Sequence, residues 1–142
     1  MPTVLFLCTG NYYRSRFAEI AFNALAAERG SAWRADSRGL RINPFNFGPI
    51  SPHTNLALED LDIPLPPERF PIALTEDDLQ GATHVVAVKE AEHRELLEAN
   101  FPAWVERVEY WRIDDLDCAE PAQALPLLHE HVRKLFERLA RK

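Results

Sequence analysis

The chain has 142 residues, 46% of them hydrophobic and 27% charged, which is an ordinary composition for one soluble globular domain. A net charge of −6 disfavours nucleic acid and anionic membranes as partners, and no apolar run is long enough to span a membrane. No signal peptide is visible, and the two cysteines, Cys8 and Cys118, argue against a disulfide framework. We therefore expect one domain over residues 1–142, located in the cytoplasm.

The first predicted element is a buried strand over residues 3–8, in which an apolar run leads directly into Cys8. A helical pattern follows over residues 16–29, with Ser15 as its expected N-cap and Gly30 as its stop. The loop between the two is suited to binding an anion. Backbone N–H groups at a helix start lack partners within the helix, and the helix dipole places partial positive charge there.

The residue types in this loop fit an anion with a nucleophile beside it. Gly10 and Asn11 allow the backbone to curl, and Arg14 can close the ring with a forked grip on oxygen atoms. Cys8 would then lie beneath the anion, where the same positive groups favour thiolate over thiol. The alternative is that Cys8 is only a buried core cysteine at a strand end.

The remaining elements alternate between strands and helices. Further strands are predicted near residues 32–37, 84–88 and 106–111. A short helix is predicted to end at Leu61, with Thr54 as its cap, and another to start at Thr75. Two longer helices are predicted over residues 90–100 and 121–142. The Pro-rich loop between residues 40 and 53 carries Phe45 and Phe47, which we expect to fold back on the core. The alternative is that they form a hydrophobic wall beside the anion-binding loop, where an aromatic substrate would lie. This order predicts an α/β fold, a four-stranded parallel sheet with helices on both faces.

The run Cys-Thr-Gly-Asn-Tyr-Tyr-Arg-Ser at residues 8–15 resembles the signature loop of the low-molecular-weight protein tyrosine phosphatases, Cys-x-Gly-Asn-x-x-Arg-Ser. The resemblance implies strand order 2-1-3-4 and hydrolysis of a phosphate monoester through a phosphocysteine intermediate. It implies neither a metal nor an organic cofactor. The phosphate-binding residues would be Thr9, Gly10, Asn11, Tyr12, Tyr13, Arg14 and Ser15.

The resemblance also assigns roles to single residues. Cys8 is the expected nucleophile, Arg14 holds the phosphate, and Asp115 is the expected general acid. Leu116 replaces the proline that follows this aspartate in the family, so Asp114 and Asp117 remain alternatives. Ser37 corresponds to a serine that supports the loop by hydrogen bonding with Asn11 and Ser15.

Several points stay open at this stage. Tyr13 could narrow the entrance to the anion-binding loop, stack on a substrate or simply pack. The five histidines are interpreted as structural or surface residues, with no metal site. The expected partner is a phosphorylated protein or a small phosphate ester, with inorganic phosphate as product. The alternatives are a thioredoxin-coupled arsenate reductase, for which Cys118 would be the only further cysteine, and a phosphate-binding module with little or no catalysis. A sugar phosphotransferase subunit is disfavoured because its loop lacks the closing arginine.

Overall fold

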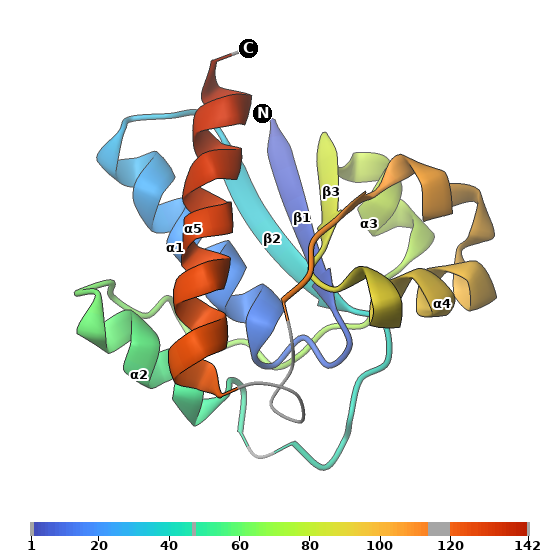
Figure 1. Ribbon diagram of the computed structural model, residues 1–142, viewed down its shortest axis with the longest axis horizontal. Helices are drawn as coiled ribbons and strands as arrows, with labels where there is room; N and C mark the ends of the chain where they lie inside the picture. The colour runs from blue at the N-terminus through green and yellow to red at the C-terminus, as the bar shows by residue number, and fades with distance from the viewer. Residues whose placement is uncertain (1, 47, 114–119, 142) are drawn as a thin grey trace.

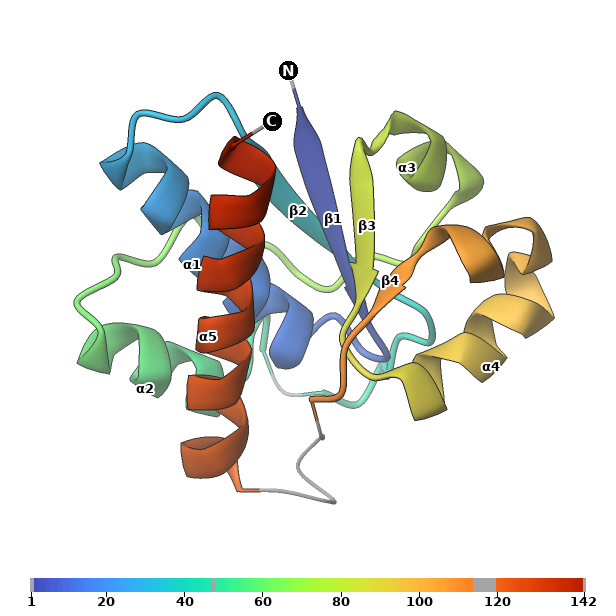
Figure 2. The ribbon, with the colours of Figure 1, turned by 45° about the horizontal axis from the view of Figure 1, so that its top comes forward.

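The computed structural model describes residues 2–46, 48–113 and 120–141. Within them, four parallel strands form one sheet of order β2-β1-β3-β4, with helices on both faces (Figures 1 and 2). The strands are β1 (Thr3–Cys8), β2 (Arg34–Gly39), β3 (His84–Ala87) and β4 (Glu109–Tyr110). The helices are α1 (Arg14–Glu28), α2 (Pro52–Asp60), α3 (Glu76–Gly81), α4 (Glu90–Asn100), α5 (Pro121–Ala140) and the 3₁₀ helix η1 (Pro102–Arg107). The predicted fold class and strand order are confirmed.

Strand β1 lies at the centre of the sheet and is covered on both sides. Val4, Phe6 and Cys8 point into a core formed with α1 and α5. Leu5 and Leu7 point into a second core formed with α3, α4 and η1. Successive side chains of a strand face opposite sides, so a strand buried on both faces reads as a continuous apolar run, as this one does.

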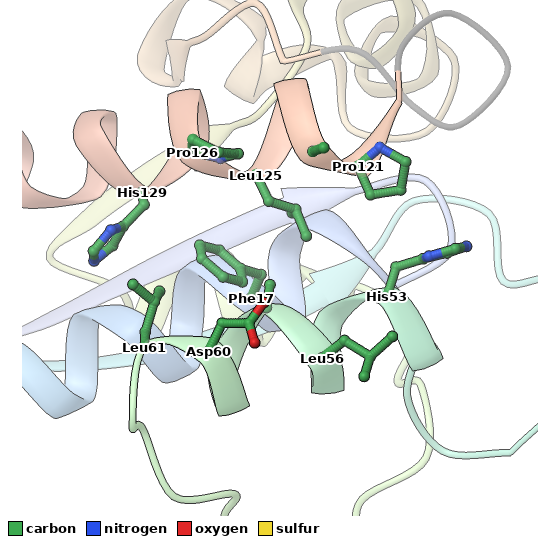
Figure 3. A pocket seen from close by; sticks show the side chains of 11 residues that line it. Phe17, His53, Leu56, Asp60, Leu61, Pro121, Leu125, Pro126 and His129 are labelled. Atoms are coloured by element: carbon green, nitrogen blue, oxygen red, sulfur yellow. The ribbon is translucent and has the colours of Figure 1, made fainter.

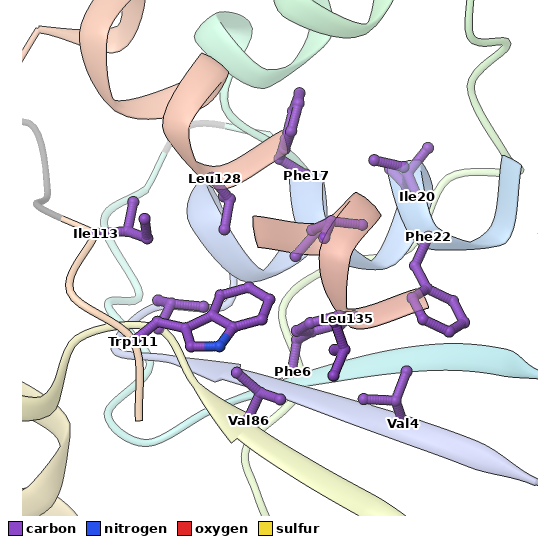
Figure 4. Packing of buried hydrophobic residues seen from close by; sticks show 14 of the residues in the cluster. Val4, Phe6, Phe17, Ile20, Phe22, Val86, Trp111, Ile113, Leu128 and Leu135 are labelled. Carbon is purple, nitrogen blue, oxygen red and sulfur yellow. The ribbon is translucent and has the colours of Figure 1, made fainter. Parts of the chain in front are cut away.

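Aromatic rings fill the core between the sheet and the α1–α5 pair (Figure 4). The ring of Phe22 packs edge-on against Phe6 and Phe136, with centroids 6.1 and 5.5 Å away. Trp111 adds its indole 5.8 Å from Phe6. This packing fixes α1 against the end of β1 and so fixes the loop that joins them.

In the described part of the chain, no helix combines the length and apolarity needed to cross a bilayer.

Two predicted helix caps were wrong. Helix α1 begins at Arg14, one residue before the expected cap, and Ser15 is its second residue. The hydroxyl of Ser15 instead contacts the sulfur of Cys8. Helix α2 is capped by Ser51 rather than Thr54, whose hydroxyl donates to the carbonyl of Tyr13. In both cases a tertiary partner takes the hydroxyl that a cap would use.

Two strand boundaries and one loop side chain also differ from expectation. Strand β2 begins at Arg34 because Gly30 adopts a φ of 62° and the Ser31 hydroxyl accepts from the N–H of Trp33, which makes a turn. Strand β4 is shorter than predicted because residues 102–107 form η1. Phe45 is 90% exposed, so its predicted return to the core was wrong. Phe47 lies outside the described residues.

Neighbouring leucines on α5 test the packing of this core. Leu128 is fully buried, whereas Leu127 is 45% exposed. We predict that Leu128→Ala lowers the free energy of unfolding by about 2–5 kcal/mol, because it removes packed atoms and leaves a cavity. Leu127→Ala makes the same change in helix propensity and serves as the control, with a loss below about 1 kcal/mol. Urea denaturation measures both, and equal losses would contradict this account of the core.

Candidate active site

The site lies at the sheet edge where the parallel strands end. Cys8 ends β1 and stands in register with Gly39, which ends β2. Side chains from the loops after several strands meet at such an edge. A Cβ at Gly39 would lie 3.0 Å from the carbonyl oxygen of Thr9 and 3.1 Å from the Cβ of Asn11. Only a glycine therefore lets the loop after Cys8 pack this closely against β2.

Three carbonyl groups of the signature loop (residues 8–15) accept hydrogen bonds from the chain that surrounds the loop. The carbonyls of Cys8 and Thr9 accept from the N–H groups of Leu40 and Arg41, at 2.9 and 2.8 Å. The carbonyl of Tyr12 accepts from the N–H of Ser51 at 2.9 Å. In a trans peptide the N–H points away from the C=O. The N–H groups that follow these outward carbonyls therefore point toward the inside of the loop.

The buried amide of Asn11 ties the loop together. Asn11 has a φ of 51°, a left-handed conformation that asparagine tolerates better than most residues. Its Nδ2 donates to the hydroxyls of Ser15 and Ser37, both at 2.9 Å. The Ser15 hydroxyl in turn lies 2.8 Å from the sulfur of Cys8. The structure thus brings together the three side chains that the sequence grouped as loop support, and links them to Cys8.

A charged cluster behind the loop was missed by the sequence prediction. The Ser37 hydroxyl donates to the Glu19 carboxylate at 2.6 Å, and Arg16 donates to the same oxygen at 2.9 Å. Arg69 donates to the Glu19 carboxylate at 3.0 Å and to the side-chain Oδ1 of Asn11 at 3.1 Å. Arg69 lies in the second Pro-rich loop, far from Glu19 in sequence, so no local pattern indicated this contact.

Arg14 belongs to the signature loop, and its buried side chain contacts two other parts of the chain. Its Nη1 donates to the carbonyl of Ile113 at 2.8 Å, just beyond the end of β4. Its Nη2 lies 3.4 Å from both carboxylate oxygens of Glu92 on α4. Ile113 is the last described residue before the acidic segment, so Asp114, Asp115, Asp117 and Cys118 lie outside the described residues.

Thr9 connects the signature loop to α4 through two side chains. Its hydroxyl contacts the Glu92 carboxylate and lies 3.1 Å from Nε2 of His93. Nδ1 of His93 accepts from the N–H of Lys89 at 3.0 Å, which places the ring proton on Nε2. The pKa of His93 is lowered to about 3, mainly by burial and in addition by the positive charges of Arg14 and Lys89. His93 is thus a neutral donor next to the signature loop, which the sequence prediction did not recognise.

The two tyrosines of the loop differ in exposure. Tyr12 is half-buried, whereas Tyr13 is 5% exposed and its ring packs edge-on against His53, with centroids 6.3 Å apart. Of the roles left open for Tyr13, the structure shows packing.

A separate hollow of about 400 Å³ lies between α2 and α5 (Figure 3). Its lining includes Phe17, Leu56, Leu61 and Leu125 and is mainly apolar. Among the described residues, no member of the signature loop lines it. An apolar lining offers few donors to an anion, so this hollow is distinct from the site at the sheet edge.

The family model described as low molecular weight phosphotyrosine protein phosphatase matches residues 3–142. The chain belongs to this family. The resemblance predicted from the signature loop is therefore confirmed over nearly the whole length of the chain.

Individual relatives agree with this assignment. The chain is 28% identical to a protein-arginine-phosphatase of Bacillus subtilis (strain 168), over 98% of this chain and 92% of the relative. Its structure is similar to that of a low molecular weight protein tyrosine phosphatase from T. tengcongensis, with 27% identity, a TM-score of 0.77, and coverage of 98% and 97%. The solution structure of a Bacillus subtilis low molecular weight protein tyrosine phosphatase gives 25% identity, a TM-score of 0.81, and coverage of 99% and 98%. The family and these neighbours are cysteine-based protein phosphatases, which are hydrolases, so the predicted enzyme class is confirmed.

The low pKa of His93 makes a prediction about acid stability. The unfolded chain takes up a proton at His93 near the ordinary pKa of 6.5, whereas the folded chain does so only near 3. His93 therefore lowers the free energy of unfolding as pH falls through this window, by up to about 1.4 kcal/mol per pH unit. We predict that His93→Gln makes stability depend less steeply on pH between 6.5 and about 4.5. Urea denaturation along a pH series measures this, and parallel curves for wild type and variant would refute it.

Proposed function

We propose that this chain hydrolyses phosphate monoesters on proteins through a phosphocysteine intermediate, with Cys8 as the nucleophile. The observation that carries the proposal is that the Cys8 sulfur lies 2.8 Å from the Ser15 hydroxyl, in the same loop as the Arg14 guanidinium. A hydroxyl at this distance can donate to a thiolate and stabilise it. The inward N–H groups and the guanidinium supply donors for the phosphoryl oxygens.

In the first step the Cys8 thiolate attacks phosphorus, an S–P bond forms, and the P–O bond to the leaving group breaks. Arg14 and the loop N–H groups hold the three non-bridging oxygens, and Asp115 donates a proton to the leaving oxygen. In the second step Asp115 takes a proton from water, which attacks phosphorus as the S–P bond breaks. Ser15 stabilises the thiolate that departs, and inorganic phosphate is released.

Asp115 remains the proposed acid, with Asp114 and Asp117 as alternatives. Support comes from the Ile113 carbonyl, which is bound to Arg14 at 2.8 Å. Asp115 follows Ile113 by two residues, and a chain extends by at most about 3.5 Å per residue. The described chain before the acidic segment therefore ends, at Ile113, next to the guanidinium that would hold the phosphate.

The proposed substrate is protein phosphotyrosine, in keeping with the family, and small phosphate esters of similar shape would also react. A second candidate is protein phosphoarginine, because a 28% identical relative is a protein-arginine-phosphatase.

We propose that residues 1–142 act as one phosphatase domain. A cytoplasmic location fits a chain with two cysteines and no disulfide framework.

The test compares one peptide phosphorylated on tyrosine with a matched peptide phosphorylated on arginine, at neutral pH and without added metal. Wild type is expected to release phosphate from the tyrosine peptide with the higher kcat/KM. Cys8→Ser is expected to abolish release. Asp115→Ala is expected to lower kcat by about 10²–10⁴, the usual contribution of a positioned acid.

The exposed Asp77→Ala on α3 is the control for removal of a carboxylate and is expected to keep wild-type activity. A larger loss in Asp114→Ala or Asp117→Ala than in Asp115→Ala would reassign the acid. Higher kcat/KM on the arginine peptide would favour the second candidate. Phosphate binding without release from either peptide would contradict hydrolysis and leave a binding module.

A further inference from the structure

Glu92 stands out because it places a carboxylate against the buried Arg14 guanidinium at the signature loop. The side chain of Arg14 is 2% exposed and that of Glu92 is 30% exposed. Both carboxylate oxygens lie 3.4 Å from the same nitrogen, Nη2. A buried guanidinium is stable only with negative charge or acceptors close by, and Glu92 supplies such a charge.

Glu92 is held in this place by more than one contact. The Thr9 hydroxyl contacts Oε1 of Glu92. The hydroxyl accepts from Nε2 of His93, which leaves its own proton for the carboxylate. Neutral His93, Thr9 and Glu92 therefore form a directed chain of donors that ends on the carboxylate. This organisation distinguishes Glu92 from an ordinary surface ion pair, which holds no fixed geometry.

We propose that Glu92 is the resident counter-ion of Arg14, and that it limits how tightly the signature loop binds a phosphoryl group. The inference rests on the proposed function, in which Arg14 holds the phosphoryl oxygens. A phosphate dianion that reaches Nη2 must replace Glu92 or lie beside it, and either arrangement costs binding energy because like charges repel. Glu92 thus weakens binding of substrate and of the product phosphate alike.

The opposite role, in which Glu92 merely holds Arg14 in position, predicts the opposite result. Nη1 of Arg14 is anchored separately by the Ile113 carbonyl at 2.8 Å. Loss of the carboxylate therefore leaves Nη1 anchored and removes the Glu92 charge from beside Nη2. Weaker anion binding after loss of Glu92 would indicate a positioning role, and tighter binding indicates competition.

Sulfate is the probe, because it keeps its two charges from about pH 4 to pH 8. Among the described residues, Arg14 on α1 and His93 on α4 carry charged or titratable groups beside Glu92, and the signature loop also carries the Cys8 thiol. Binding is therefore measured by calorimetry in a Cys8→Ser background, which removes the thiol. His93 stays neutral over this range, because burial holds its pKa at about 3.

We expect Glu92→Gln to bind sulfate roughly tenfold more tightly at neutral pH, the scale of one lost charge in a partly exposed site. Glu92→Asp, which retracts the charge by one methylene, should fall between the two. Glu95→Gln removes an exposed charge from the same helix and serves as the control, with affinity unchanged.

Kinetics give an independent readout in the chain with Cys8 intact. Glu92→Gln should lower KM for phosphotyrosine peptide and the inhibition constant of phosphate by a similar factor, without raising kcat. Unchanged or weaker sulfate binding in Glu92→Gln, with the Glu95→Gln control still binding, would overturn the counter-ion role alone. Failure of every variant to bind sulfate would instead overturn the proposed phosphate site, and the counter-ion role with it.

Discussion

The buried amide of Asn11 is the constraint on which the rest of the site depends. Its Nδ2 holds Ser15 and Ser37, and its Oδ1 accepts from the Ile72 N–H at 3.0 Å and from Arg69 at 3.1 Å. Every polar atom of this amide is therefore used. The amide compensates for a positive φ that costs most residues free energy, and it joins strand ends that are distant in sequence. A polar network that is fully bonded in this way specifies one loop conformation.

Charge balance around the loop follows from the same arrangement. Two buried arginines, Arg14 and Arg16, and the part-exposed Arg69 lie close to the signature loop. Glu19 balances Arg16 and Arg69 from behind, whereas Glu92 balances Arg14 from the side of α4. The ion pairs of Glu19 with Arg16 and Arg69 are structural and hold the loop in a fixed conformation. In the proposed mechanism the pair at Arg14 lies where the phosphoryl group would bind, so the Glu92 carboxylate would compete with that group.

Local patterns in the sequence predicted the parts of the fold that depend on neighbouring residues. The apolar run before Cys8, the acidic start of α3 and the charged helix α4 were all recognised, since each is specified within a few residues. The Ser15 hydroxyl shows the limit of such reasoning. Its sequence position suits a helix cap, yet the sulfur of Cys8 and the amide of Asn11 take the hydroxyl once the loop has folded.

Most of the contacts that the sequence did not predict join distant segments. Arg69 bonds to Glu19 although fifty residues separate them in the sequence. Glu92 and His93, on helix α4, contact Thr9 in the signature loop. Neither pair leaves a periodic or motif signal, because the relevant spacing is set by the order of strands in the sheet. The signature loop itself was recognisable because its residues are contiguous and each needs a particular backbone or side-chain chemistry.

Trapping the phosphorylated enzyme tests the central claim most directly. Wild type and Cys8→Ser would each be mixed with phosphotyrosine peptide, quenched within the first turnover, digested and analysed by mass spectrometry. The account predicts one phosphoryl group on the peptide that contains Cys8, attached to sulfur, and its absence from the corresponding peptide of Cys8→Ser under the same brief exposure. Rapid release of phosphate with no phosphoryl group on Cys8, or a phosphoryl group on another side chain, would contradict it.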